Sequence, residues 1–110
     1  MGLVVAIYEA TEHWPREEQF GGLTSPVRRA AVSVPSNIAE GHGRTGPREF
    51  SHHLSIAYGS LCEVETQLES AERLSYLDAT VTETLMASVA DVRRLLRGLL
   101  RSLRDTGSPP

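Results

Sequence analysis

The sequence predicts an all-α protein, an antiparallel up-down four-helix bundle with a short first helix. Two stripes of apolar residues, each repeating at alternating steps of four and three, run over residues 50–71 and 85–103. That repeat places the apolar side chains on one face of each helix. Short turns rich in glycine and proline separate the stripes, and we find no every-second-residue alternation of the kind that marks a strand. Helices joined by short turns pack antiparallel to their neighbours, which favours an up-down bundle.

The first two helices are predicted from shorter stripes. The first stripe ends at Pro15, because the residue before a proline avoids helical geometry, and it consists of Leu3, Ile7, Ala10 and Trp14. Residues 16–22 are expected to form a charged loop. Ser25 is expected to cap the second helix, with Pro26 in its first turn and an end near Gly41 or Gly43. The second stripe consists of Val27, Ala31, Val34 and Ile38.

Pro35 lies inside this second helix. An interior proline removes one backbone hydrogen bond and clashes with the preceding turn, at a cost of roughly 3 kcal/mol. We therefore expect packing against other helices, or against another subunit, to hold the helix together.

The third and fourth helices carry the longest stripes. Pro47 suits the first position of the third helix, whose stripe is Phe50, Leu54, Ala57, Leu61, Val64, Leu68 and Ala71. Residues 75–79 form a break, and a capping box at residues 80–83 is expected to open the fourth helix. The fourth stripe is Leu85, Val89, Val92, Leu96, Leu99 and Leu103. We expect one bundle domain over residues 1–104 and a disordered tail over residues 105–110.

The composition restricts the class of protein. A chain of 110 residues suits one domain with one core. Its single cysteine, Cys62, allows no intramolecular disulfide, which fits a reducing compartment, and no apolar run approaches the ~18 residues of a membrane span. The first eight residues lack a basic leader, so no signal peptide is predicted. We therefore expect a cytoplasmic protein without membrane contact.

Charge is unevenly distributed along the chain. The net charge is −3, yet residues 1–90 carry six Arg and twelve acidic residues, whereas residues 91–110 carry five Arg and two Asp. These five arginines fall within roughly a 100° sector of the fourth helix, away from its leucine stripe: Arg93, Arg94, Arg97, Arg101 and Arg104. Three interpretations stay open: a solvated basic face, contact with RNA or DNA phosphates, and ion pairs with the third helix, through Glu63, Glu65, Glu69 or Glu72.

A polar stripe runs along the second helix, opposite its apolar stripe. Residues at steps of four, three and four form it, and Asn37 lies beside it; the set is Arg29, Ser33, Ser36, Asn37 and Glu40. The stripe is either a solvated outer face or a subunit interface. Small neighbouring residues, Ala30, Ala31 and Ala39, permit close helix approach and favour the interface.

The remaining reactive residues predict no metal site and no cofactor. His52 and His53 are adjacent, and adjacent helical residues do not share a face. Cys62 lacks an activating base, so we interpret it as a small buried or half-buried apolar residue. Arg48 and His53 flank four residues, a spacing that resembles the HEPN ribonucleases, where arginine would hold the scissile phosphate and histidine would act as acid or base.

A long motif carries a family resemblance. It comprises residues 28–41, Leu23–Ser25 before them, and Arg44, Glu49–Phe50 and Ala57–Leu61 after them. With residues 63–68 and 73–77, the motif resembles the four-helix-bundle proteins encoded in intervening sequences of large-subunit ribosomal RNA genes. The resemblance covers nearly the whole chain.

The resemblance implies a bundle with no established enzymatic activity. A similar bundle, the accessory variability protein of diversity-generating retroelements, is a pentamer that binds nucleic acid and works beside a reverse transcriptase. This chain departs from the family pattern at Pro26, where glutamine is common, and at Gly21–Gly22, which adds a glycine. The family's first helix is usually longer, so we expect the chain to begin within it. The chain is also acidic, whereas the nucleic-acid-binding relative is basic.

Two functional hypotheses follow. The main one is a non-enzymatic homo-oligomeric scaffold, a pentamer by resemblance, that contacts RNA, DNA or a protein that handles nucleic acid. The alternative is a HEPN-like ribonuclease that uses Arg48 and His53.

Overall fold

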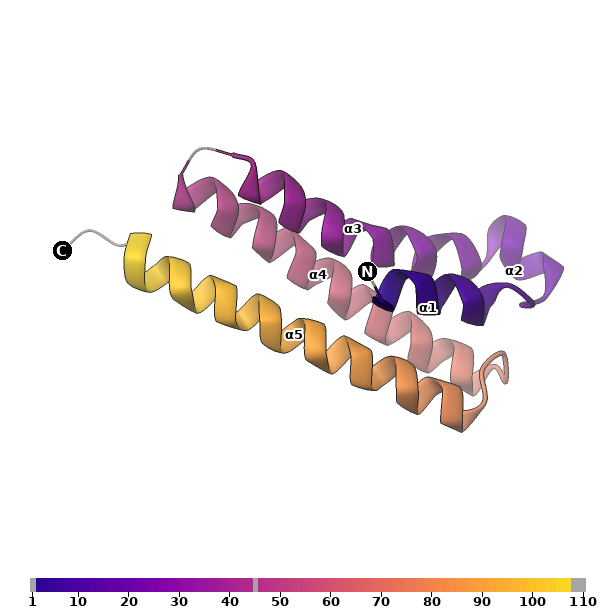
Figure 1. Ribbon diagram of the computed structural model, residues 1–110. Coiled ribbons are helices and arrows are strands. Elements are labelled where there is room, and N and C mark those ends of the chain that lie inside the picture. Colours follow the sequence, from indigo (N-terminus) through magenta and orange to yellow (C-terminus); the bar gives the residue numbers. More distant parts are fainter. Residues whose placement is uncertain (1, 45, 108–110) are drawn as a thin grey trace.

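The computed structural model describes residues 2–44 and 46–107, and every regular element in these ranges is a helix (Figure 1). The helices are α1 (Gly2–Thr11), α2 (Arg16–Gly21), α3 (Thr24–His42), α4 (Pro47–Arg73) and α5 (Ala79–Gly107). The predicted all-α antiparallel bundle with a short first helix is confirmed. No described helix is both long enough and apolar enough to cross a membrane.

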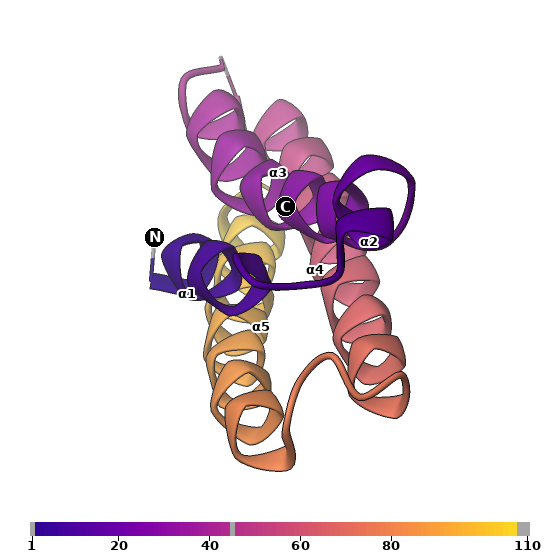
Figure 2. The same ribbon diagram turned by 90° about the vertical axis from the view of Figure 1, so that its right-hand side faces the viewer.

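The bundle is a layer of three long helices with a short fourth one laid on it. Helix α4 lies in the middle, and α3 and α5 run antiparallel to it on its two sides (Figure 1). Figure 2 shows α1 between α3 and α5, on the side away from α4. Within the described residues α1 packs on both α3 and α5, whereas the backbones of α3 and α5 stay farther apart from each other. Helix α1 therefore closes the bundle over only part of its length.

The four predicted stripes form the core. Leu54, Leu61 and Leu68 of α4 are completely buried, and so are Ile7 of α1 and Leu96 of α5. The ends of the stripes are less covered: Ile38, Phe50, Val92, Leu99 and Leu103 are half-buried against the core. The periodicity of the sequence thus identifies the buried face of every long helix.

The segment after Pro15 differs from the predicted charged loop, because residues 16–21 form α2. Its Glu18 carboxylate accepts two hydrogen bonds, from the Leu23 backbone N–H at 2.5 Å and from the Tyr76 hydroxyl at 3.0 Å. The bond to Glu18 raises the pKa of Tyr76, since it favours the protonated hydroxyl. Glu18 therefore joins α2, the start of α3 and the turn before α5.

Two helix starts also differ from the prediction. Helix α3 begins at Thr24 after Leu23, so Ser25 lies inside it and accepts a hydrogen bond from Arg29 instead of capping the helix. Helix α5 begins at Ala79, and Asp78 caps it by accepting the Val81 N–H at 2.8 Å. Asp78, two residues upstream of Thr80, thus replaces the expected capping box.

Helix α5 also extends further than predicted. It continues to Gly107, three residues past the expected domain boundary at 104. The last residues of the predicted disordered tail, 108–110, lie outside the described residues.

Helix α3 continues through Pro35 without interruption. Its face before the proline is tightly covered, since Ala31 is completely buried and Val34 is 3% exposed, and Ile38 after it is half-buried against the core. This packing against neighbouring helices compensates for the backbone hydrogen bond that the proline removes, as the sequence led us to expect.

Gly41 was expected only to end the helix, but it is buried at the contact between α3 and α4. A Cβ atom at this position would lie 2.6 Å from the His53 Cβ and 3.0 Å from a ring carbon of Phe50. The absence of a side chain therefore allows the two helices to approach closely at this point.

Replacing Leu61 should test the core directly. Because Leu61 is completely buried, Leu61→Ala should lower the free energy of unfolding by about 2–5 kcal/mol. Leu61→Asp should prevent folding, since it buries an unpaired charge. Circular dichroism during urea titration measures both effects. The neighbouring Cys62 is exposed, so Cys62→Asp is the matched control and should change stability by about 0.5 kcal/mol or less.

Two glycine substitutions should have opposite effects. Gly41→Ala should lower the free energy of unfolding by about 1–3 kcal/mol, because the new methyl group overpacks the α3–α4 contact. Gly59→Ala should raise it by roughly 0.5–1 kcal/mol, because Gly59 lies in α4 with open space around it and alanine favours the helix. Equal effects of the two substitutions in urea titration would contradict the close approach at Gly41.

Candidate interaction surfaces

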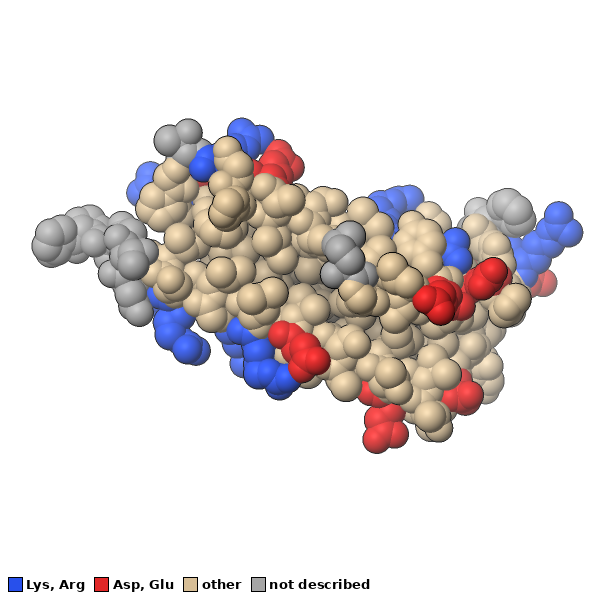
Figure 3. Space-filling model, viewed as in Figure 1, with Lys and Arg blue, Asp and Glu red and all other residues tan. Residues whose placement is uncertain are grey.

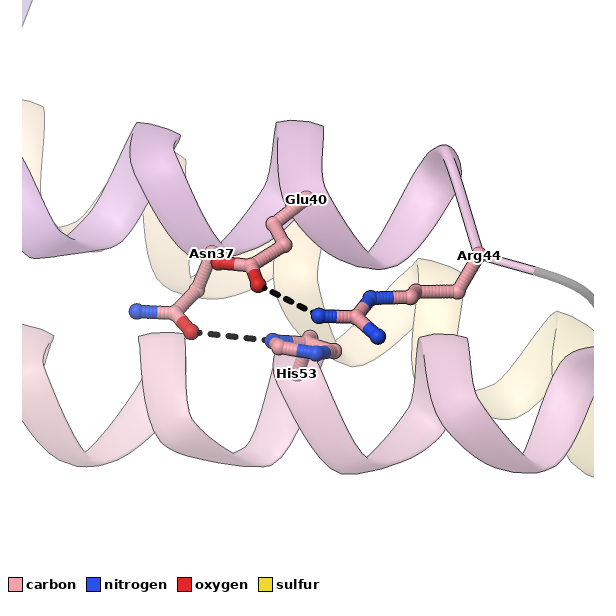
Figure 4. Close-up of polar contacts among 4 residues, drawn as sticks. All are labelled: Asn37, Glu40, Arg44 and His53. Carbon is pink, nitrogen blue, oxygen red and sulfur yellow. Dashed lines mark hydrogen bonds and ion pairs between the residues drawn. The ribbon is translucent and has the colours of Figure 1, made fainter.

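A chain of hydrogen bonds joins α3 to α4 at the polar stripe, and Figure 4 shows the bond between Asn37 and His53. The Asn37 amide nitrogen donates to the Ser33 carbonyl at 2.9 Å and to the Ser33 hydroxyl at 3.0 Å. The Ser33 and Ser60 hydroxyl oxygens are 2.8 Å apart, and Nδ1 of His53 lies 3.1 Å from Oδ1 of Asn37. Since an amide oxygen only accepts, His53 carries a proton on Nδ1.

An ion pair lies at the exposed end of this chain. Arg44 Nη2 donates to Glu40 Oε1 at 2.8 Å, and Figure 4 shows the Arg44 guanidinium reaching toward both Glu40 and His53. The hydrogen bond from Arg44, and secondly the charge of His53, lower the pKa of Glu40. The bond to Glu40 raises the pKa of Arg44. Both side chains are more than half exposed, so the pair stabilises the helix end only weakly.

The polar stripe therefore divides into two parts. Ser33 and Asn37 are half-buried and face α4, which corrects the expectation that the whole stripe lies opposite the core. Arg29, Ser36 and Glu40 are exposed on the outside of α3. Only these exposed residues offer their side chains to another molecule.

Two of the arginines of α5, Arg93 and Arg97, contact α4, whereas Arg94 pairs within α5. Arg93 donates to Glu65 at 2.6 Å, which confirms one of the ion pairs considered from the sequence, and this bond raises the pKa of Arg93. Arg94 pairs with Asp91 within α5. Arg97 donates to the Tyr58 hydroxyl at 3.1 Å, and its guanidinium carbon lies 5.9 Å from the centre of the Tyr58 ring. Tyr58 is a partner that the charge pattern did not indicate.

Three of these arginines surround a basic hollow at the seam between α4 and α5. The hollow is lined by Ser51, Arg97, Leu100, Arg101 and Arg104. Figure 3 shows arginine side chains gathered along the lower edge of the molecule, toward the end of α5. Guanidinium groups bind phosphate or carboxylate through paired N–H donors, so the hollow has the chemistry of an anion site.

The residues of the ribonuclease alternative do not lie together on α4. Arg48 and His53 are five positions apart, which turns them about 140° from each other on a regular helix. Arg48 is exposed, whereas His53 is half-buried and turned toward Asn37 of α3. Cys62, expected to be buried or half-buried, is exposed. Among the described residues, no group of three His, Cys, Asp or Glu side chains could hold a metal ion.

Comparison with known proteins assigns the chain to a protein family. No curated protein matches the sequence. A family model described as 23S rRNA-intervening sequence protein matches residues 1–98, which is most of the 110-residue chain. This match agrees with the resemblance carried by the motif over residues 28–41, of which Ser33 and Asn37 take part in the α3–α4 chain of hydrogen bonds. The chain therefore belongs to the family of 23S rRNA-intervening sequence proteins.

Proposed function

We propose that this protein is a non-enzymatic, homo-oligomeric helical scaffold of the cytoplasm that contacts RNA or DNA through the basic hollow of α5. The observation that carries the proposal is the convergence of Arg97, Arg101 and Arg104 with Ser51 at one seam of the bundle. Tyr58 holds the Arg97 guanidinium at the edge of this hollow. A positioned guanidinium loses less side-chain entropy when it binds a phosphate.

Oligomerisation would supply the affinity for nucleic acid that a single copy lacks. The net charge of −3 opposes binding to a polyanion, so one hollow alone would bind weakly. Several copies would present several hollows to one nucleic acid, and linked sites raise the avidity. We propose the pentamer that the resemblance implies, with a protein that handles nucleic acid as the other class of partner.

The exposed part of the polar stripe is the proposed subunit contact of the pentamer. Arg29, Ser36 and Glu40 lie on the outer face of α3, and exposed Ala39 between them permits another helix to approach closely. Arg44 holds the Glu40 carboxylate in place without covering it, since Glu40 stays 54% exposed. A held carboxylate on an exposed face suits an ionic contact with a neighbouring subunit.

Glu40→Ala should weaken assembly and leave the fold intact. Loss of one charged contact should raise the dissociation constant about tenfold, equivalent to about 1.4 kcal/mol. Sedimentation velocity over a concentration series measures the change, and circular dichroism checks the helix content. Glu63→Ala is the matched control, since Glu63 is an exposed glutamate of α4. If both variants assemble equally, Glu40 has no part in the subunit contact.

Arg101→Gln should weaken nucleic-acid binding and flatten its salt dependence. Binding that neutralises phosphates releases counterions, so removing one arginine should reduce the slope of log K against log salt by up to about one unit. Fluorescence anisotropy with a labelled RNA hairpin and a labelled DNA duplex measures this slope. Arg73→Gln is the control, because Arg73 is exposed at the opposite end of α4 and its loss changes the net charge equally.

The same samples test the proposal as a whole. No binding by the parent protein at low salt would remove nucleic acid from its function. Cleavage of the RNA, abolished by His53→Ala, would instead establish the ribonuclease.

A further inference from the structure

A polar hollow lies between α1 and α3, at the end of the bundle where α2 connects the two helices (Figure 1). It is at the Thr11 end of α1, away from Gly2, and its helices are not those of the basic hollow of α5. Two of its lining side chains are positively charged, and none of the described lining residues is acidic. The polar residues of the lining are Tyr8, Gln19, Thr24, Ser25, Arg28 and Arg29.

Arg28 is held at the wall of this hollow by three contacts. Its Nε donates to the Thr11 hydroxyl at 2.8 Å, and its Nη2 donates to the Tyr8 carbonyl at 3.3 Å. Its guanidinium carbon lies 4.5 Å from the centre of the Tyr8 ring. A guanidinium has five N–H donors, so three donors of Arg28 stay available for another acceptor. Because the side chain is already ordered, binding an anion would cost it little further entropy.

Arg29 is also positioned, because its Nη2 donates to the Ser25 hydroxyl at 3.2 Å. Among the residues that the structure describes, no carboxylate forms an ion pair with Arg28 or with Arg29. Both arginines lack such a partner although residues 1–90 contain twelve acidic residues and six arginines. Two neighbouring guanidinium groups that line one hollow without an internal counter-charge favour an anion from outside the chain.

Thr24 points to a ligand independently of the arginines. It is 3% exposed, and its hydroxyl has no hydrogen-bond partner in the part of the chain that the structure describes. A buried hydroxyl without a partner destabilises a folded protein unless a ligand or a water bonds to it. Thr24 is also the first residue of α3, where the positive end of the helix dipole favours a negative group. The hollow that Thr24 lines therefore suits a ligand that is negatively charged and rich in acceptors.

We propose that this hollow binds the phosphate group of a small phosphate monoester. Such a group carries a charge of about −1.5 to −2 at pH 7, which two guanidinium groups balance. Its three terminal oxygens are one acceptor more than a carboxylate offers, and the Ser25 hydroxyl, which accepts from Arg29, keeps its own proton to donate. The hollow has a volume of about 400 Å³, which is more than a phosphate group fills. The organic part of the ester would lie against Tyr8 and Val32, which also line the hollow and are 43% and 39% exposed.

Titration with phenyl phosphate, followed by ¹H–¹⁵N NMR, tests this site. The dissociation constant should be about 1 mM or lower. The signals that shift should include the Ser25 amide and the side-chain Nε–H groups of Arg28 and Arg29. Phenol, which lacks the phosphate, should shift none of them at the same concentration. Absence of binding would overturn the proposal, and so would shifts confined to the arginines of α5.

A substitution in the hollow should weaken this binding specifically. Arg29→Gln should raise the dissociation constant for phenyl phosphate about tenfold, because it removes a charge-assisted hydrogen bond. Arg48→Gln is the matched control, since Arg48 is exposed at the start of α4, beside the opposite end of α3. Its loss changes the net charge equally and should leave the constant unchanged. Equal weakening by both substitutions would reduce the effect to net charge and overturn the site.

Thr24→Val distinguishes a ligand-binding hydroxyl from one that serves the fold, and Thr24 lies outside the proposed subunit contact. Valine keeps the shape of the side chain and removes the unpartnered hydroxyl, so the protein without ligand should be at least as stable in urea titration. Phenyl phosphate should bind about threefold more weakly, because one hydrogen bond to the ligand is lost. Lower stability with unchanged binding would overturn the place of Thr24 in the site.

Discussion

Burial of the apolar stripe of α4 is the interaction on which the whole bundle depends. Helix α4 packs on both α3 and α5 along much of its length, and in the described residues the backbones of α3 and α5 do not approach each other closely. Six residues of its stripe, from Leu54 to Ala71, are completely covered. A central helix flanked by two others forms a layer. Apolar side chains on either face of such a layer are exposed to water unless another element covers them. Within the described residues α1 covers part of one of these faces.

The parts that the sequence predicts well are those that follow from helical periodicity. A stripe at steps of four and three is buried because apolar side chains must leave water, and that requirement depends little on which helix covers them. Pro35 illustrates the same point, because the burial of Ala31 and Val34 in the preceding turn outweighs the local preference against proline. The motif around Pro35 also predicts the family to which the bundle belongs, which the family model confirms.

The parts that the sequence does not predict depend on side chains that meet across the fold. Glu18 of α2 accepts hydrogen bonds from Leu23, five positions away, and from Tyr76, 58 positions away. No local sequence pattern indicates the contact with Tyr76. Angular position alone places Ser33 in a stripe opposite the apolar one, with Asn37 beside it, and predicts either a solvated face or a subunit interface. The close approach of α4, permitted by Gly41, turns that part of the stripe into an internal seam. Likewise the spacing of α5 indicates a basic sector but not that Tyr58 positions one of its arginines.

The seam between α3 and α4 fixes the axial position of one helix on the other. The His53 ring donates to Asn37, Asn37 donates to Ser33, and the Ser33 and Ser60 hydroxyls form one hydrogen bond in which either of them donates. Apolar stripes alone would tolerate sliding α3 along α4 by one turn, about 5.4 Å, because another apolar residue would enter each site. That slide would break both hydrogen bonds that cross between the helices, His53 to Asn37 and Ser33 to Ser60. The polar chain therefore acts as a register mark, which holds the two helices at one axial offset and with them every surface built on α3.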